Sequence, residues 1–155
     1  MFTVPDLKYE YDALQPSISE EIMRLHHDKH HKVYVDKLND ALDGLSDWQS
    51  KPIEEILQNL DQLPREIAAA VRNNGGGHYN HSLFWQWLSP NKSEPSNELK
   101  EALEAKYDSF DKFKDEFNEQ ATKLFGSGWC WLLDDLTITT TPNQDSPIMS
   151  GQKPI

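Results

Sequence analysis

The alternation of apolar and polar residues predicts one long helix near the start of the chain. Ser17 and Glu20 have the S-x-x-E spacing of a capping box, and the polar residues after them alternate with apolar ones at a helical period. This pattern continues until Gly44, a residue that commonly ends helices. We therefore predict a helix over about residues 18–43.

Prolines predict where the next helices begin. Pro52 and Pro64 each stand where a first helical residue would, because a helix leaves the N–H of that residue unbonded. Three glycines at 75–77 favour a break or kink in the helical pattern. The helices predicted on this basis cover residues 53–60, 65–73 and 78–88.

The second half of the chain changes from helix to sheet. Turn-forming residues at 89–95 predict a linker, and two amphipathic segments follow it, at 98–107 and 110–124. Aromatic and β-branched runs at 129–133 and 136–141 predict a hairpin. We expect an α+β fold in which an N-terminal α-hairpin domain, residues 1–90, precedes a C-terminal α/β domain, residues 91–155, with a small antiparallel sheet.

The last stretch, residues 142–155, contains three prolines and ends on an apolar residue directly after a proline. A two-stranded hairpin is marginally stable by itself and normally needs a third strand. We therefore expect that the sheet is incomplete here and that the sequence stops before the last strand of the domain.

The composition of the chain indicates which kinds of molecule the protein is not suited to bind and which compartment suits it. The formal net charge is −11, which disfavours binding to nucleic acid or to an anionic membrane surface. No apolar run is long enough to span a bilayer, and no secretory signal is recognisable, so we expect a cytoplasmic protein. Cys130 is the single cysteine, which excludes an internal disulfide and suits a reducing compartment.

All six histidines lie within two short segments, 26–34 and 75–85. On an α-helix, His26, His30 and Tyr34 share an apolar face, so they are expected to point toward the core. A buried imidazole can be a hydrogen-bonded core residue or a metal ligand, and the first segment alone favours the core reading. The second segment, with His78 and His81 one helical turn apart, shifts the balance toward a metal site shared by two helices.

Four motifs together resemble the manganese/iron superoxide dismutase family, from about Pro5 to the last residue. They are the histidine-rich run at 26–34, Gly-Gly-Gly-His-Tyr-Asn-His-Ser-Leu-Phe-Trp at 75–85, Gly-Ser-Gly-Trp-Cys-Trp-Leu at 126–132 and Asn-Gln-Asp-Ser-Pro at 143–147. Their order and approximate spacing agree with that family.

The resemblance assigns a role to each candidate site residue. It implies that His26 and His81 bind the metal, and that His30 and Tyr34 line the substrate funnel and deliver protons. Gln144 would hydrogen-bond metal-bound solvent, with Trp85 and Trp129 as walls of the pocket. His27, His31 and His78 have no such counterparts, and we expect them to be structural.

The resemblance also implies cofactor, substrate and assembly. Glycine at Gly77 and glutamine at Gln144 match manganese-type members, so manganese is expected, with iron as the alternative. Superoxide would be the substrate, converted to dioxygen and hydrogen peroxide. Phe125, Ser127 and Asn74 match positions near the family's dimer interface, which implies a homodimer or a tetramer.

Two metal ligands of the family lie in an Asp-x-x-x-His element that these 155 residues lack. Two imidazoles alone do not hold a labile first-row ion tightly. We therefore expect full dismutase activity to need those further ligands. A non-catalytic helical protein that dimerises and binds metal weakly or not at all is the alternative, and a helical metal-storage or sensing protein is a third.

Overall fold

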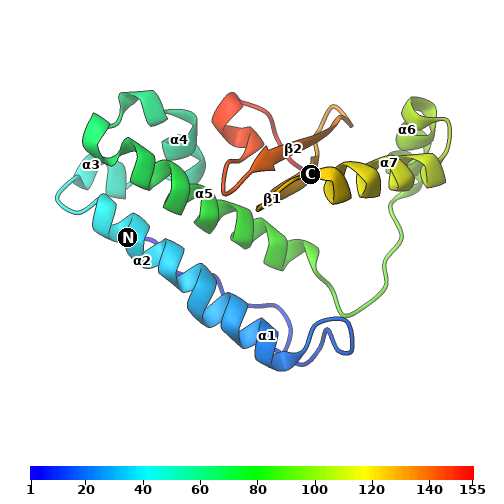
Figure 1. Cartoon of the computed structure of the whole chain (residues 1–155), viewed down its shortest axis with the longest axis horizontal. Helices are drawn as coiled ribbons and strands as arrows, with labels where there is room; N and C mark the ends of the chain where they lie inside the picture. Colours follow the sequence, from blue (N-terminus) through cyan, green and yellow to red (C-terminus); the bar gives the residue numbers. More distant parts are fainter. The chain divides into compact units, whose positions relative to one another are not determined.

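The computed structural model describes residues 1–155 and contains two compact units, Met1–Lys92 and Ser93–Ile155 (Figure 1). The first unit is built from helices. The second combines two helices with a two-stranded antiparallel sheet. The predicted α+β fold, helical first and mixed afterwards, is confirmed.

The long first helix is present, but it is not a uniform α-helix. It consists of α1 (Glu20–Leu25), a π-helical segment η1 (His26–His31) and α2 (Lys32–Ala41). The predicted cap, Ser17, was wrong by two residues. The hydroxyl of Ser19 accepts a hydrogen bond from the backbone N–H of Ile22 at 3.3 Å, so Ser19 satisfies one of the free N–H groups of the first turn.

The π-helical segment changes which side chains face the core. Buried positions recur every four residues along this helix, at Met23, His27, His31 and Val35. Only the step from His27 to His31 lies within η1, whose turns hold more residues than the 3.6 of an α-helix. The prediction that His26 and His30 point into the core holds only in part: His26 is half-buried against the rings of His81 and Trp85, whereas His30 is exposed.

The longest helix of the first unit, α5 (Arg65–Trp87), runs without interruption through the three glycines. The predicted break at 75–77 was wrong: the helix continues, and Gly75 and Gly77 allow other side chains to pack closely against it. A Cβ added at Gly75 would lie 3.2 Å from Cδ1 of Ile53. In Figure 1, α2 and α5 run side by side, and they share the most extensive helix contact of the unit.

Three short elements connect α2 to α5, namely α3 (Ser46–Gln49), α4 (Ile53–Gln58) and the 3₁₀ turn η2 (Leu60–Gln62). Their apolar side chains close one end of the helix pair. The fully buried members of this core are Leu38, Leu42, Ile56, Leu57 and Val71. Each contributes roughly 1.5–3 kcal/mol through the removal of its side chain from water. This core fixes how α2 and α5 lie against each other, and so fixes the histidines that these helices carry.

The second unit contains α6 (Asn97–Tyr107), α7 (Phe110–Lys123), β1 (Gly128–Leu132), β2 (Ile138–Pro142) and the 3₁₀ turn η3 (Pro147–Ser150). The predicted helices and hairpin are confirmed, with boundaries shifted by one or two residues. The strands pair antiparallel, with Cys130 opposite Thr140. Trp131 is almost fully buried, and its indole N–H donates to the hydroxyl of Thr141 at 2.8 Å.

The residues after β2 fold back on the hairpin. The Thr141 hydroxyl donates to the carbonyl of Asp145 at 2.7 Å, and Leu133 forms an isolated antiparallel bridge with Pro154. The backbone N–H of Ile155 also donates to the carbonyl of Leu132 at 2.9 Å. The final residues therefore cover an edge of the two-stranded sheet.

Replacement of Ser109 by alanine is expected to destabilise the second unit by about 1 kcal/mol. The Ser109 hydroxyl accepts from the backbone N–H of Lys112 at 3.1 Å and caps α7, so alanine leaves that N–H without its partner. Ser93→Ala, at an exposed serine outside the helices, is the control. Urea unfolding of both variants measures the difference, and equal midpoints would contradict the capping role.

Candidate metal centre

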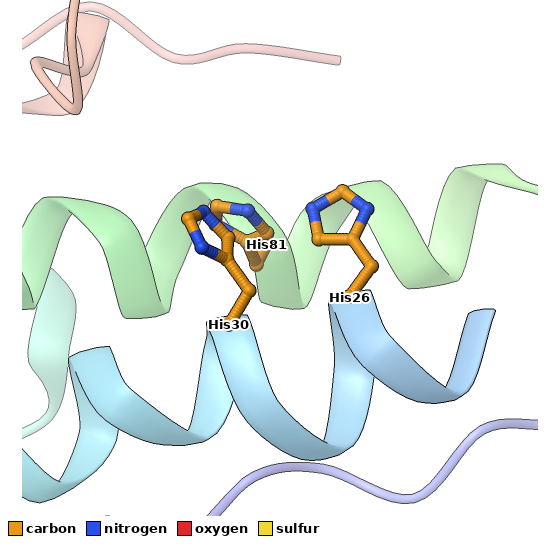
Figure 2. Close-up of side chains that lie close together, drawn as sticks. All are labelled: His26, His30 and His81. Atoms are coloured by element: carbon orange, nitrogen blue, oxygen red, sulfur yellow. The ribbon is translucent and has the colours of Figure 1, made fainter. Parts of the chain in front are cut away.

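Three histidines from two helices meet in the first unit. His26 and His30 come from the π-helical segment η1, and His81 comes from α5 (Figure 2). One nitrogen from each ring lies within 4.8 Å of a nitrogen of each other ring. The family resemblance predicted His26 and His81 as ligands. That the ring nitrogen of His30 also lies within 4.8 Å of theirs was not predicted.

The orientation of the His81 ring is fixed by its own helix. Its Nδ1–H donates to the carbonyl of Gly77 at 2.7 Å, so the lone pair of the neutral ring is on Nε2. Burial lowers the pKa of His81 from 6.5 to about 4, and burial likewise lowers the pKa of His26. Both rings are therefore neutral at physiological pH, which is the form that binds metals.

Tyr34 and Gly77 lie beside this cluster. The Tyr34 ring makes an edge contact with His30, with 4.9 Å between ring centroids, and lies 5.4 Å from the His81 ring. A Cβ added at Gly77 would lie 2.5 Å from Cγ of Tyr34. The absence of a side chain at Gly77 thus makes room for the Tyr34 ring, a packing reason that the sequence did not reveal.

A hydrogen-bond chain lies on the buried side of the cluster. The indole N–H of Trp85 donates to Nδ1 of His31 at 2.9 Å. His31 must then carry its proton on Nε2, which lies 2.9 Å from Nδ1 of His78 and donates to it. Burial lowers the pKa of His31 to about 3 and that of His78 to about 4, so this chain stays neutral.

Sequence reasoning treated His31 and His78 as structural residues and found no connection to Trp85. The three residues are separated by up to 54 positions along the chain, so no local motif links them. The only sequence feature that could have indicated this chain is a buried imidazole, because both of its nitrogens need hydrogen-bond partners. The ring of Trp85 also lies 4.9 Å from that of His26, so the chain supports one side of the histidine cluster.

His27 ties the N-terminal segment to the same helix. Its ring nitrogens lie 2.9 Å from the carbonyl oxygen of Pro5 and 2.7 Å from the carboxylate of Asp28. The hydroxyl of Tyr11 donates to that carboxylate at 2.6 Å, and these bonds lower the pKa of Asp28. His27 is therefore fully engaged in anchoring.

The two remaining predicted site residues lie in the second unit. The indole N–H of Trp129 donates to the side-chain oxygen of Gln144 at 3.2 Å. Trp129 is in β1, and Gln144 follows β2. Trp129 and Gln144, which were predicted separately as site residues, are therefore hydrogen-bonded to each other.

Comparisons with known proteins identify the family. Residues 1–89 match the alpha-hairpin domain of iron/manganese superoxide dismutases, and residues 95–155 match the C-terminal domain of the same family. The chain belongs to the iron/manganese superoxide dismutase family. The superoxide dismutase [Mn] of Listeria ivanovii is 49% identical over 158 residues, covering 99% of this chain and 78% of the relative. That of Listeria innocua serovar 6a gives the same values.

Membership of the iron/manganese superoxide dismutase family confirms the resemblance inferred from the four motifs. The two family domains follow each other in the order that the motifs predicted. None of the helices is both long and apolar enough to cross a bilayer.

Proposed function

We propose that this chain is a superoxide dismutase that converts superoxide to dioxygen and hydrogen peroxide with a manganese ion, or with iron as the alternative. The observation that carries the proposal is the meeting of His26 and His81, from two different helices, in a member of this family. The relatives from both Listeria species are named as manganese enzymes, which favours manganese.

The ring nitrogens of His26 and His81 suit a manganese or iron ion, but they supply only part of the ligands that such an ion needs. The Nδ1–H of His81 donates to the Gly77 carbonyl, so the lone pair of this ring is on Nε2, and the neutral ring of His26 lies 5.0 Å away between centroids. Imidazole nitrogens suit first-row ions, and a bound manganese or iron ion would supply the electron transfer. His26 and His81 are the proposed ligands.

His30 and Tyr34 are the proposed proton-handling pair. Their rings are in edge contact, and His30 is exposed while Tyr34 is half-buried. A pair that reaches from solvent toward the metal ligands can pass protons inward to the product. His30 would take a proton from solvent, and the Tyr34 hydroxyl would hold one nearer the ligands.

The remaining assigned roles stay predictions. Trp85 is the proposed wall on the α5 side, in edge contact with His26. Gln144, paired with Trp129, is the proposed partner of metal-bound solvent. We further propose that full activity requires a carboxylate and a third imidazole of the Asp-x-x-x-His type, because two imidazoles provide little affinity or geometry.

We also propose that the chain forms a homodimer in the cytoplasm. Within each chain, the proposed boundary between the two domains lies between residues 90 and 91. The single cysteine, Cys130, suits a reducing compartment, and burial raises the pKa of its thiol, which keeps it unreactive. Phe125 is 99% exposed, and so large an apolar side chain is better covered by a partner than by water.

The test is dismutase activity and metal content of the purified chain loaded with manganese or iron, alone and extended by a segment bearing Asp-x-x-x-His. We expect little activity from the chain alone and at least a hundredfold more from the extended form, because the added ligands complete the ion's coordination. His81→Gln should abolish the gain, whereas Trp87→Phe, at a half-exposed position of the same helix, should retain it.

An extended form that binds stoichiometric manganese and shows no dismutase activity would refute the proposal in favour of a non-catalytic protein. Full activity of the unextended chain would refute the requirement for further ligands. His81→Gln with unchanged metal content would remove His81 from the ligand set.

A further inference from the structure

The first fourteen residues form an N-terminal strap that contains neither helix nor strand. Its two ends are bound to different helices. Near the start, the backbone N–H and carbonyl of Phe2 both bond to the side chain of Asn39 in α2, at 2.8 and 2.9 Å. At the end, Leu14 packs in one cluster with Met23 of α1 and Trp85 of α5. The strap therefore connects both flanks of the first long helix, and it connects that helix to α5.

The middle of the strap is hydrogen-bonded to the π-helical segment η1. The Tyr11 hydroxyl donates to the Asp28 carboxylate at 2.6 Å, a length typical of a charge-assisted hydrogen bond. The backbone carbonyl oxygen of Pro5 lies 2.9 Å from Nε2 of His27. In Figure 2 the strap is the violet-blue tube on the opposite side of η1 from the two labelled rings that η1 carries. The strap therefore binds the face of η1 that those rings leave open.

A π-helical turn within an α-helix needs contacts from outside the helix to stabilise it. Such turns are rare, so the α-helical form of the same residues is generally the more stable one. Relaxation of η1 to an α-helix would turn one flank of the helix relative to the other by about 100°, which is the rotation of one residue.

That rotation would fall on α1 and on the first residue of η1. The buried side chains of Val35 and Leu38 hold α2 against α5, so α2 is the flank that stays in place. The first residue of η1 is His26, whose ring lies 5.0 Å from the ring of His81 and 4.9 Å from that of Trp85. Loss of the π-helical form would therefore carry His26 away from both rings.

We infer that the Tyr11–Asp28 hydrogen bond is a latch that keeps η1 in its π-helical form and so places the ring of His26 beside those of His81 and Trp85. Tyr11 and Asp28 are positioning residues that act through the backbone of η1. The inference rests on the proposed function only for the role of His26. The arrangement that it describes can be measured without metal and without activity.

The test is Tyr11→Phe in the metal-free full chain, followed by amide hydrogen exchange and by nuclear Overhauser effects between rings. Phenylalanine removes the hydroxyl but keeps the ring, whose centroid lies 4.2 Å from the guanidinium carbon of Arg24. We expect the amides of residues 26–31 to exchange at least about tenfold faster, because loss of a bond to a charged group favours local opening. The Overhauser effects from His26 to His81 and to Trp85 should weaken, while exchange in α4 stays unchanged.

Tyr9→Phe is the matched control, because it makes the same change in the same strap but removes a bond to α5. The Tyr9 hydroxyl donates to the backbone carbonyl of Trp85 at 3.2 Å and does not bond to η1. Exchange of the η1 amides and the ring contacts of His26 should therefore match those of the parent chain.

Substitution of Asp28 tests the other half of the latch. Asp28→Asn keeps an oxygen that can accept from the Tyr11 hydroxyl, so it should retain the parent's slow exchange in η1. Asp28→Ala removes the acceptor and should behave like Tyr11→Phe.

Three results would overturn the latch: unchanged exchange of η1 in Tyr11→Phe, an equal effect of Tyr9→Phe, or exchange that speeds up by the same factor in η1 and α4. The third would show a general loss of stability rather than a release of η1. None of these readouts involves metal or turnover, so a failure of the dismutase proposal would be seen separately in the activity assay.

Discussion

Replacement of Trp85 by alanine is expected to lower the free energy of unfolding by about 3–5 kcal/mol. Trp85 is 3% exposed and packs in a cluster with Leu14 and Met23. Alanine would leave a cavity where the indole lies, and it would remove the N–H that donates to Nδ1 of His31. The measurement is urea unfolding of the metal-free chain in chelator, so that metal binding does not contribute.

Two further variants separate the contributions of packing and hydrogen bonding. Trp85→Phe keeps most of the apolar volume but leaves a buried nitrogen of His31 unbonded, which should cost about 1–3 kcal/mol. Trp87→Ala changes a tryptophan two residues away that is 46% exposed, and it should cost much less than Trp85→Ala. Equal destabilisation by Trp85→Ala and Trp87→Ala would show that the indole of Trp85 does not have the structural role described.

Sequence patterns predicted the order and type of most elements because helix signals are local. The prolines at 52 and 64 begin helices, and the aromatic and β-branched runs form β1 and β2. The error at 75–77 arose because glycine has two uses that look alike in sequence. It can break a helix, or it can allow another chain segment to approach closely, and only the packing of α5 against its neighbours decides between them.

The histidine cluster could be predicted only in part for a similar reason. Clustering along the chain pointed to the correct two helices, and the resemblance selected His26 and His81 as ligands. The direction in which His30 points depends on the π-helical segment, which no residue pattern indicated. An assumed α-helical period therefore placed His30 in the core, whereas the structure places it at the surface with its ring beside those of the other two.

Replacement of Gly77 by alanine is expected to destabilise the chain by about 1–3 kcal/mol and to displace the Tyr34 ring. The added Cβ would lie 2.5 to 2.8 Å from three ring atoms of Tyr34, including Cγ, and Cγ cannot move far without movement of the backbone of α2. The intrinsic helix propensity of alanine, which is better than that of glycine by about 0.8–1.0 kcal/mol, would offset only part of this cost. Thermal or urea unfolding measures the net change, and the proton-handling role of Tyr34 predicts a loss of dismutase activity in the extended form of the chain.

Gly75→Ala is the matched control because it makes the same change two residues earlier in the same helix. Its Cβ would lie 3.2 Å from Cδ1 of Ile53 and 3.3 Å from Cδ2 of Leu57, which are the ends of flexible side chains that can shift by a few tenths of an ångström. We therefore expect Gly75→Ala to be close to neutral. In the double variant Gly77→Ala, Tyr34→Ala the ring is absent, so the cost of the added methyl group should largely disappear, and the two changes should be strongly non-additive. Additive costs, or a Gly77→Ala variant as stable as Gly75→Ala, would show that the space at Gly77 is not reserved for the Tyr34 ring.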